Sequence, residues 1–401
     1  MAEKFLLLES IHTVAAEQLA GDGYEVELLN TSLKEDELIA KLQGVQVLGI
    51  RSKTQVTPRV LDAAKDLIAV GAFCIGTNQI ALEHAMRRGI CVFNAPFSNT
   101  RSVAELVLAE IVVLSRHVGD RNTEMHRGQW RKVATGAHEV RGKTLGVVGY
   151  GHIGRQIGVI AEFFGMRVVF HDVAQRLPMG NNQPSASLDA LLAQSDFVTL
   201  HVPETPQTRN LVGAAELAKM KRGACLLNLS RGTVVDLDAL AAAITIGHIA
   251  GAAVDVYPDE PEANSSDGFA TPIQGLPNVV LTPHIGGSTL EAQESIGREV
   301  ATSLSKYLKS GATAGSVNFP HVELARVAAT HRVINVHQNV PGVLRDVNKI
   351  VSDHDANILA QVLSTNADIG YLVMDFDARA HHAIADAMRK LPTTISARAV
   401  D

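Results

Sequence analysis

Arginine, glutamate and histidine side chains could together catalyse the oxidation of a hydroxy acid, and one of each lies near the end of a predicted strand: Arg231, Glu260 and His284. Taking a hydride from a secondary alcohol also requires removing the hydroxyl proton, so the site needs a group that titrates near neutral pH. His284 meets this need, and Glu260 could hold its imidazole in one tautomer and raise its pKa. Arg231 could bind a substrate carboxylate through two parallel N–H bonds.

The same residues also have simpler interpretations. The sequence holds 16 histidines, and a histidine after a strand is often just exposed to solvent. Glu260 lies in a proline-rich loop, where acidic residues are common. Spacing alone therefore leaves the pairing of His284 with Glu260 open, and the elements that would position the two residues must be considered.

A glycine motif predicts a dinucleotide site. Gly149, Gly151 and Gly154 form G-x-G-x-x-G between a predicted strand, 145–148, and a predicted helix, 155–164. These glycines would allow a tight turn, close approach of a pyrophosphate to the backbone, and close packing of the helix on the strand. The next strand ends at Asp172, where a carboxylate bonds the adenosine ribose and repels a 2′-phosphate. The motif therefore predicts NAD rather than NADP.

The order of predicted elements indicates an α/β protein with three sheets. Residues 1–98 alternate strands with helices, and residues 99–285 repeat this pattern around the glycine motif, which predicts two doubly wound parallel sheets. After a linker near 310–320, residues 331–401 follow the order strand, helix, strand, strand, helix, strand, a ferredoxin-like βαββαβ pattern. Arg51 and Ser52 follow a strand of the first sheet, so they could meet an anion or form a solvated basic turn.

Composition excludes several classes of protein. The net charge is −6 and the basic residues are scattered, which argues against a nucleic-acid surface. The apolar runs are shorter than a membrane span and no signal peptide is recognisable, so we expect a cytosolic protein. We expect its three cysteines to be buried thiols without disulfide or metal, although Cys225 lies near a predicted cofactor loop and a reactive thiol there stays open. Trp130 lies among cations and favours a subunit contact over ordinary packing.

Four motifs, found in order at 149–154, 230–232, 259–261 and 281–289, resemble the signatures of the D-isomer-specific 2-hydroxyacid dehydrogenases. The resemblance implies that Arg231 binds the substrate carboxylate, Glu260 supports His284, and His284 transfers the proton. It implies an NAD-binding domain over 99–285 and a substrate domain assembled from 1–98 and 286–320. The cofactor contacts expected from the resemblance and from strand-end positions are Gly149, Gly151, His152, Ile153, Gly154, Asp172, His201, Leu229, Ser230, Arg231, Asp255, His284, Ile285, Gly286 and Gly287.

Three further segments, 74–79, 93–105 and 126–128, resemble bacterial members of the family that oxidise D-3-phosphoglycerate. The resemblance implies NAD-dependent conversion of 3-phosphoglycerate to 3-phosphohydroxypyruvate, the first step of L-serine synthesis, with reduction of 2-oxoglutarate to 2-hydroxyglutarate as a side activity. The expected substrate contacts are Arg51, Ser52, Asn99, Arg231 and Gln293. A dehydrogenase for glycerate or lactate and a dinucleotide-sensing regulatory protein are the alternatives.

The C-terminal pattern is similar to ACT domains, and 337–344 matches their first loop. The resemblance implies L-serine as a feedback inhibitor, bound by His337, Asn339 and, across a domain pair, Asn357. Pairing of both the nucleotide and ACT domains favours a homotetramer. A purely structural pairing module is the alternative. Ala329 and Thr330 stand where some serine-sensitive relatives have adjacent glycines, which puts the strength of inhibition in question.

Overall fold

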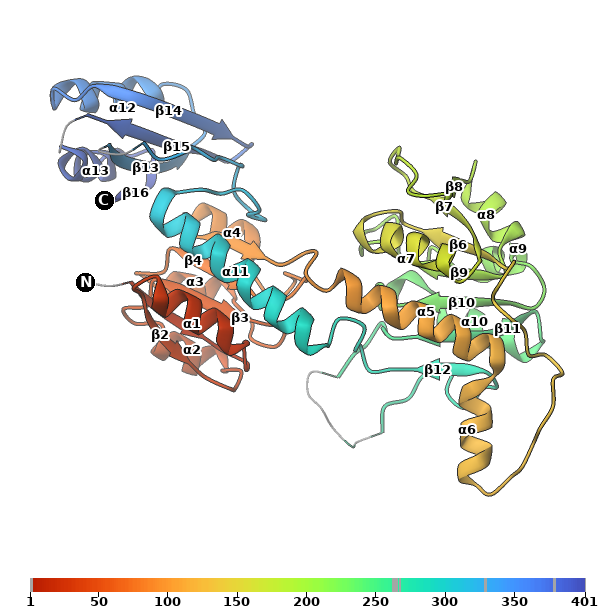
Figure 1. Ribbon diagram of the computed structural model, residues 1–401. Coiled ribbons are helices and arrows are strands. Elements are labelled where there is room, and N and C mark those ends of the chain that lie inside the picture. The colour runs from red at the N-terminus through yellow and green to blue at the C-terminus, as the bar shows by residue number, and fades with distance from the viewer. Residues whose placement is uncertain (1–2, 262–265, 267, 328–329, 378–379, 401) are drawn as a thin grey trace. The chain divides into compact units, whose positions relative to one another are not determined.

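The computed structural model describes residues 3–261, 266, 268–327, 330–377 and 380–400. The chain divides into two compact units, Met1–Ser98 with Gln293–Asp401, and Asn99–Ala292. Figure 1 shows the sheets of both units with their helices. The expected fold class is confirmed: two parallel α/β sheets are followed by an antiparallel βαββαβ sheet.

The N-terminal part of the first unit is a five-stranded parallel sheet in the order β2-β1-β3-β4-β5. Its strands and helices alternate because buried apolar runs alternate with capped amphipathic segments; the Thr57 hydroxyl, for example, accepts the N–H of Val60 at the start of α3. The elements are β1 (Lys4–Leu7), α1 (Thr13–Gly21), β2 (Glu25–Leu28), α2 (Glu35–Lys41), β3 (Val47–Ile50), α3 (Pro58–Ala63), β4 (Ala69–Ala72), α4 (Leu82–Arg87) and β5 (Cys91–Asn94).

The C-terminal part of the first unit is a four-stranded antiparallel sheet in the order β14-β15-β13-β16. Two amphipathic helices cover one face of it and bury residues such as Val347 and Ile384. The elements are β13 (His331–Gln338), α12 (Val343–Asp353), β14 (Ile358–Thr365), β15 (Ile369–Phe376), α13 (His381–Arg389) and β16 (Thr394–Val400).

The two sheets of the first unit share one hydrophobic core. Helix α11 (Leu290–Ser310) contributes Val300 and Leu304 to a cluster that also holds Phe93 of β5, Ile334 of β13 and Tyr371 of β15. One face of the C-terminal sheet is therefore packed onto the rest of the unit, while its other face buries a core of its own under α12 and α13.

Buried polar contacts reinforce this junction. Arg332 is 0% exposed and forms a bidentate ion pair with Asp375, with N–O distances of 2.6 and 2.7 Å. The same guanidinium donates to the backbone carbonyls of Ser310 and Leu324, and the hydroxyl of Tyr371 donates to the carbonyl of Gly311 at 2.7 Å. The C-terminal sheet thus satisfies carbonyl groups at the end of α11, which would otherwise be unpaired inside the protein.

The second unit is a seven-stranded parallel sheet in the order β12-β11-β10-β9-β6-β7-β8. Its central strands are buried and mostly apolar, as expected for a parallel sheet covered on both faces. The elements are α5 (Thr100–Arg116), α6 (Val118–His126), β6 (Thr144–Val148), α7 (His152–Phe163), β7 (Arg167–His171), β8 (Gln183–Pro184), α8 (Leu188–Gln194), β9 (Phe197–Leu200), α9 (Ala214–Lys219), β10 (Ala224–Asn228), η1 (Gly232–Val234), α10 (Leu237–Thr245), β11 (Ile249–Val254) and β12 (Val279–Leu281).

Some elements differ from the expectation. Helices α3 and α4 were not predicted, because each spans only six residues and shows little periodicity. Helix α6 was not predicted either, because it has no buried residue and so lacks an apolar face that sequence could reveal. Strand β8 has two residues and carries no periodic signal.

Two further findings concern the described residues alone. No helix among them is long and apolar enough to cross a membrane, and a cytosolic location stays a prediction. They include no group of three or more histidine, cysteine, aspartate or glutamate residues arranged to hold a metal ion.

Candidate active site

The predicted catalytic pair lies at the carboxyl ends of two neighbouring strands of the second unit. His284 follows β12, Glu260 follows β11, and His284 Nδ1 lies 2.7 Å from Glu260 Oε2. The other carboxylate oxygen of Glu260 accepts the N–H of Tyr257 at 3.0 Å, which fixes the carboxyl group. A hydrogen on Nδ1 bonded to Glu260 would leave Nε2 of His284 as the basic nitrogen.

The pairing changes the acidity of both partners. The hydrogen bond from Glu260 raises the pKa of His284 above its usual value, against the opposite effect of burial. Burial pushes the pKa of Glu260 upward, but the hydrogen bonds from His284 and from the N–H of Tyr257 bring it below its usual value. Glu260 is therefore an anion at neutral pH and stabilises the imidazolium form of His284.

A buried carboxylate holds the loop that carries His284. Asp255 is 1% exposed, and its oxygens accept the N–H groups of Ile285 and Gly286, each at 2.8 Å, and the hydroxyl of Thr282 at 2.5 Å. The backbone of His284 is left-handed, with φ of 55°, a conformation that an L-residue keeps only when its surroundings enforce it. These hydrogen bonds indicate that Asp255 positions this loop, and its predicted contact with the cofactor stays a prediction.

Arg231 follows β10 and lies close enough to affect the catalytic pair, since its charge lowers the pKa of both His284 and Glu260. Its backbone carbonyl accepts from the side chain of Asn228 at 3.0 Å, and its Nη1 donates to the carbonyl of Ser230 at 2.7 Å. A Cβ on Gly232 would lie 1.9 Å from the backbone carbon of Tyr257, so only glycine permits this close approach. Arg231, Glu260 and His284 are thus brought together in one unit.

The glycine motif has the geometry of a pyrophosphate cradle. Gly149 has φ of 90°, and a Cβ on Gly154 would lie 2.2 Å from the carbonyl oxygen of Gly149, so the helix packs tightly against the turn. A Cβ on Gly151 would meet open space at the start of α7, where free N–H groups and the helix dipole favour phosphate. This open cradle fits the pyrophosphate of NAD.

Asp172 directly follows β7, which ends one residue earlier than predicted, and is held by several hydrogen bonds. Its Oδ2 accepts the N–H of Tyr150 and its Oδ1 that of Ala174, both at 2.8 Å. Burial pushes the pKa of Asp172 upward, but these bonds and nearby Arg176 lower it overall. Arg176, whose Nε lies 3.4 Å from Asp172, was not predicted; its position four residues after Asp172 was the available signal.

Other predicted cofactor residues lie at the same sheet edge. His201 follows β9, and its Nε2 lies 2.8 Å from the hydroxyl of Thr199. Burial lowers the pKa of His201 to about 3, so the ring is neutral at physiological pH. Burial also raises the pKa of the Cys225 thiol to about 12, which makes it a poor nucleophile.

The predicted substrate residues are distributed over the two units. Arg51, Ser52 and Gln293 lie in the first unit, whereas Asn99 and Arg231 lie in the second. Within the second unit, Asn99 packs against the loop after His284, because a Cβ on Gly287 would lie 2.2 Å from its side-chain nitrogen.

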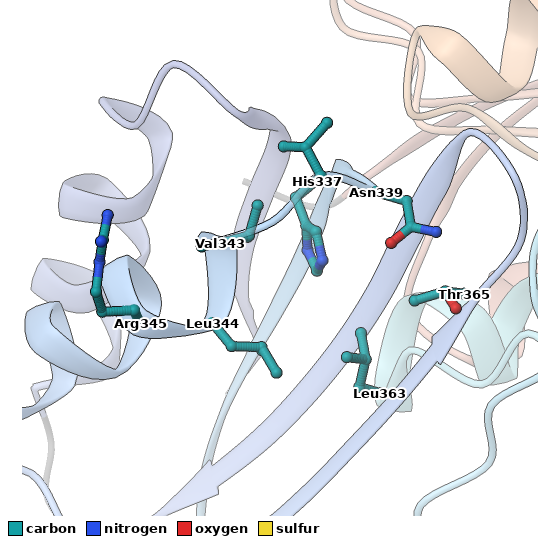
Figure 2. Close-up of a pocket in the computed structure, with 9 residues that line it drawn as sticks. His337, Asn339, Val343, Leu344, Arg345, Leu363 and Thr365 are labelled. Atoms are coloured by element: carbon teal, nitrogen blue, oxygen red, sulfur yellow. The ribbon is translucent and has the colours of Figure 1, made fainter.

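The predicted effector residues His337 and Asn339 line a pocket of the C-terminal sheet, together with residues of α12 and β14 (Figure 2). His337 Nδ1 lies 2.9 Å from the side-chain oxygen of Asn335, and burial lowers the pKa of His337. Asn339 donates to the carbonyl of Asn366 at 2.7 Å. Asn357 is not among the described residues that line this pocket; it was predicted to act across a domain pair. Thr330 is buried, and Ala329 lies outside the described residues.

Comparison with known protein families gives two matches. Residues 108–286 match the D-isomer specific 2-hydroxyacid dehydrogenase NAD-binding domain. Residues 334–396 match an ACT domain of the type found in acetohydroxyacid synthase (AHAS) small subunits.

Relatives from distant organisms align with nearly the whole chain. A D-3-phosphoglycerate dehydrogenase of Dictyostelium discoideum is 53% identical over 98% of this chain and 96% of its own length. The Escherichia coli K12 protein of the same name is 50% identical over 98% of this chain and 97% of its own length. The likeness is therefore not specific to bacterial members.

A solved structure has a similar fold over most of the chain. D-Lactate dehydrogenase of Aquifex aeolicus, solved with NAD and lactic acid, is 26% identical, with a TM-score of 0.66 over 79% of this chain and 99% of its own.

Proposed function

The chain belongs to the D-isomer specific 2-hydroxyacid dehydrogenase family, in the branch of D-3-phosphoglycerate dehydrogenases with an ACT domain, and from this premise we propose which residues oxidise D-3-phosphoglycerate. The observation that carries the assignment is the 2.7 Å contact between His284 and Glu260 beside Arg231. This arrangement supplies a base, an anion that supports it and a guanidinium within one sheet edge.

We propose that Arg231 binds the substrate carboxylate and orients the hydroxyl-bearing carbon. His284 accepts the hydroxyl proton at Nε2, and the carboxylate of Glu260 stabilises the imidazolium that results. Bound NAD supplies the hydride acceptor for this carbon. The cradle of Gly149, Gly151 and the start of α7 would hold its pyrophosphate, and Asp172 its adenosine ribose, which favours NAD over NADP.

We propose that Arg51, Ser52, Asn99 and Gln293 complete the recognition of substrate. Arg51 and Ser52 follow β3, where a guanidinium and a hydroxyl suit an anion. A second carboxylate could replace the phosphate there, so reduction of 2-oxoglutarate is proposed as a side activity.

The test of the function is NADH production from D-3-phosphoglycerate, compared with D-glycerate and D-lactate. We expect turnover of the phosphorylated acid to dominate. Equal turnover of the unphosphorylated acids would point to a broader hydroxy-acid dehydrogenase. NADH binding without turnover of any of the three acids would point to a dinucleotide sensor.

Replacing Glu260 with glutamine should shift the pH dependence of catalysis. Oxidation needs neutral His284, so the rate rises with pH through the pKa of this residue, which Glu260 raises. Removing the carboxylate lowers that pKa, and the rising limb of the kcat profile should move to lower pH. The measurement is kcat from acid to alkaline pH for both proteins. If the rising limb of the kcat profile stayed at the same pH in the Glu260→Gln protein, the group that titrates there would not be His284.

We propose that the pocket of the C-terminal sheet binds L-serine as a feedback inhibitor. His337 and Asn339 offer an imidazole and a carboxamide to the polar groups of a small amino acid, and the ACT match supports an amino-acid ligand. Because Nδ1 of His337 donates to the side-chain oxygen of Asn335, a neutral His337 offers Nε2 as an acceptor, which suits an ammonium or hydroxyl donor of the ligand.

Changing His337 to alanine should weaken inhibition by serine. Losing one or two hydrogen bonds to a charged ligand costs about 1.5–3 kcal/mol, so the half-inhibiting serine concentration should rise roughly 10- to 10²-fold. Turnover without serine is the internal control, and His382→Ala, an exposed histidine on α13, is the matched variant. An unchanged serine response would assign the pocket a structural role.

We also propose a homotetramer. Trp130 is 81% exposed and Met125 52%, and both line a second pocket beside α6. Apolar side chains exposed to this degree suit a subunit contact. Symmetric pairing through this region and through the ACT domain would give four chains, and light scattering measures the mass directly.

A further inference from the structure

The loop that follows β3 carries the predicted substrate residues Arg51 and Ser52, and its backbone is held by a buried carboxylate from another strand. Glu9, which follows β1, is 7% exposed. Its Oε2 accepts the N–H of Lys53 at 3.0 Å and its Oε1 the N–H of Thr54 at 2.8 Å. Each carboxylate oxygen thus holds one peptide group of the loop.

The preceding peptide of this loop is held as well. The side-chain nitrogen of Gln79, a residue that is 8% exposed, donates to the carbonyl of Arg51 at 2.5 Å. The backbone of residues 51–54 is therefore fixed from two sides. The side chains of Ser52 and Lys53 are nevertheless exposed and that of Arg51 is partly exposed. A rigid backbone that presents accessible polar and cationic side chains is the arrangement that a preorganised anion site requires.

The conformation of Glu9 indicates that its position is enforced. Glu9 has φ of 63° and the next residue, Ser10, φ of 53°. Two consecutive non-glycine residues in the left-handed region are strained, and such strain concentrates at functional sites. The same turn brings the backbone carbonyl of Glu9 to 3.5 Å from Nη1 of Arg51. Glu9 therefore contacts both the backbone of the loop and the guanidinium it carries.

We infer that Glu9 is a positioning residue for the substrate phosphate: its carboxylate fixes the loop of residues 51–54 so that Arg51 and Ser52 are already placed for the anion. The inference rests on the proposed function, in which these two residues contact substrate. Glu9 acts through the loop and does not itself touch the reacting atoms. The pattern requires a carboxylate, because two N–H donors need two acceptors, and a carboxamide would turn an N–H₂ group toward one of them.

The test is the substitution Glu9→Gln in the full chain. Glutamine has nearly the same size as glutamate, but its N–H₂ group would face one of the two backbone N–H groups, so one of the two hydrogen bonds would be lost. We expect the KM for 3-phosphoglycerate to rise about tenfold with kcat changed much less, the pattern of lost ground-state binding. The dissociation constant for NADH, measured by fluorescence, should be unchanged, because the predicted cofactor residues lie in the other unit. Glu17→Gln, an exposed carboxylate on α1, is the matched control with the same change of charge, and it should leave every constant unchanged.

A second variant keeps the test decisive if Glu9→Gln folds poorly. Gln79→Met removes the donor to the carbonyl of Arg51 without adding charge, and it should reproduce the selective rise in KM. An unchanged KM in both variants would overturn the inference. So would parallel loss of kcat, NADH affinity and melting temperature in both, since that is the signature of a merely structural residue. The parent protein is assayed first: if it does not oxidise 3-phosphoglycerate, the proposed function fails independently of Glu9.

Discussion

Replacing His284 with asparagine is expected to lower kcat for 3-phosphoglycerate by roughly 10²–10⁴-fold, the usual contribution of a general acid–base group. Asparagine is the suitable replacement because the backbone at this position has φ of 55°, and asparagine tolerates the left-handed region better than alanine. The loop held by Asp255 should keep its shape. The fall in kcat would then result from the missing base and not from a change in the structure of the site.

Steady-state kinetics with saturating NAD measure this effect, and titration of NADH fluorescence shows whether the cofactor still binds. The rising limb of the pH profile should also disappear, since the group that titrates is gone. A fall in kcat of less than about tenfold would contradict proton transfer by His284.

Arg231→Lys is expected to lower kcat/KM for 3-phosphoglycerate strongly although the charge is conserved. A lysine offers one point of attachment, whereas a guanidinium offers two parallel N–H bonds to a carboxylate. Losing one hydrogen bond to a charged group costs about 3 kcal/mol at the upper end of the usual range, which corresponds to roughly 10²-fold in kcat/KM.

The matched control for this change is Arg222→Lys, at an exposed turn before β10. It should leave kcat/KM and NADH binding unchanged. If Arg231→Lys retained the parent kcat/KM, the substrate carboxylate would have to bind elsewhere. Loss of NADH affinity in Arg231→Lys together with loss of kcat/KM would instead assign this arginine to the cofactor.

The parts of the fold that sequence predicted are those encoded by local patterns. The glycine motif between an apolar strand and an amphipathic helix predicted β6 and α7. Each glycine of the motif is needed for a local steric reason, such as a tight turn or close packing of the helix on the strand. Asp172 could be located because the fold requires an acid at a nearly fixed distance from that motif. The βαββαβ order of residues 331–401 was readable for the same reason, since each of its elements has a clear period.

The site itself was only partly predictable. His284 and Glu260 could be proposed from their positions after strands, but their 2.7 Å contact depends on β11 and β12 being neighbours. The left-handed backbone of His284 has no sequence signal, because only a small fraction of non-glycine residues, histidine included, adopt it. Asp255 was predicted only as a cofactor contact, and nothing in the sequence shows that its two oxygens accept N–H groups of residues about thirty positions downstream.

Glu9 illustrates a different limit. It looks like an ordinary acid at the end of the first strand, and its hydrogen bonds with Lys53 and Thr54 join segments more than forty residues apart. Such pairs follow from the order of strands in the sheet, β1 beside β3, which periodicity does not reveal.

The shared core of the first unit predicts what deletion of the C-terminal domain would do to the stability of the remaining chain. A gene shortened before residue 330 would encode an α11 whose apolar residues Val300 and Leu304 lose the cover of Ile334 and Tyr371. The carbonyls of Ser310 and Leu324 would also lose their donor, Arg332. Each effect costs stability. Loss of the ACT domain by truncation would therefore destabilise the remainder of the first unit, and polar substitutions at the newly exposed positions of α11 would offset part of that cost.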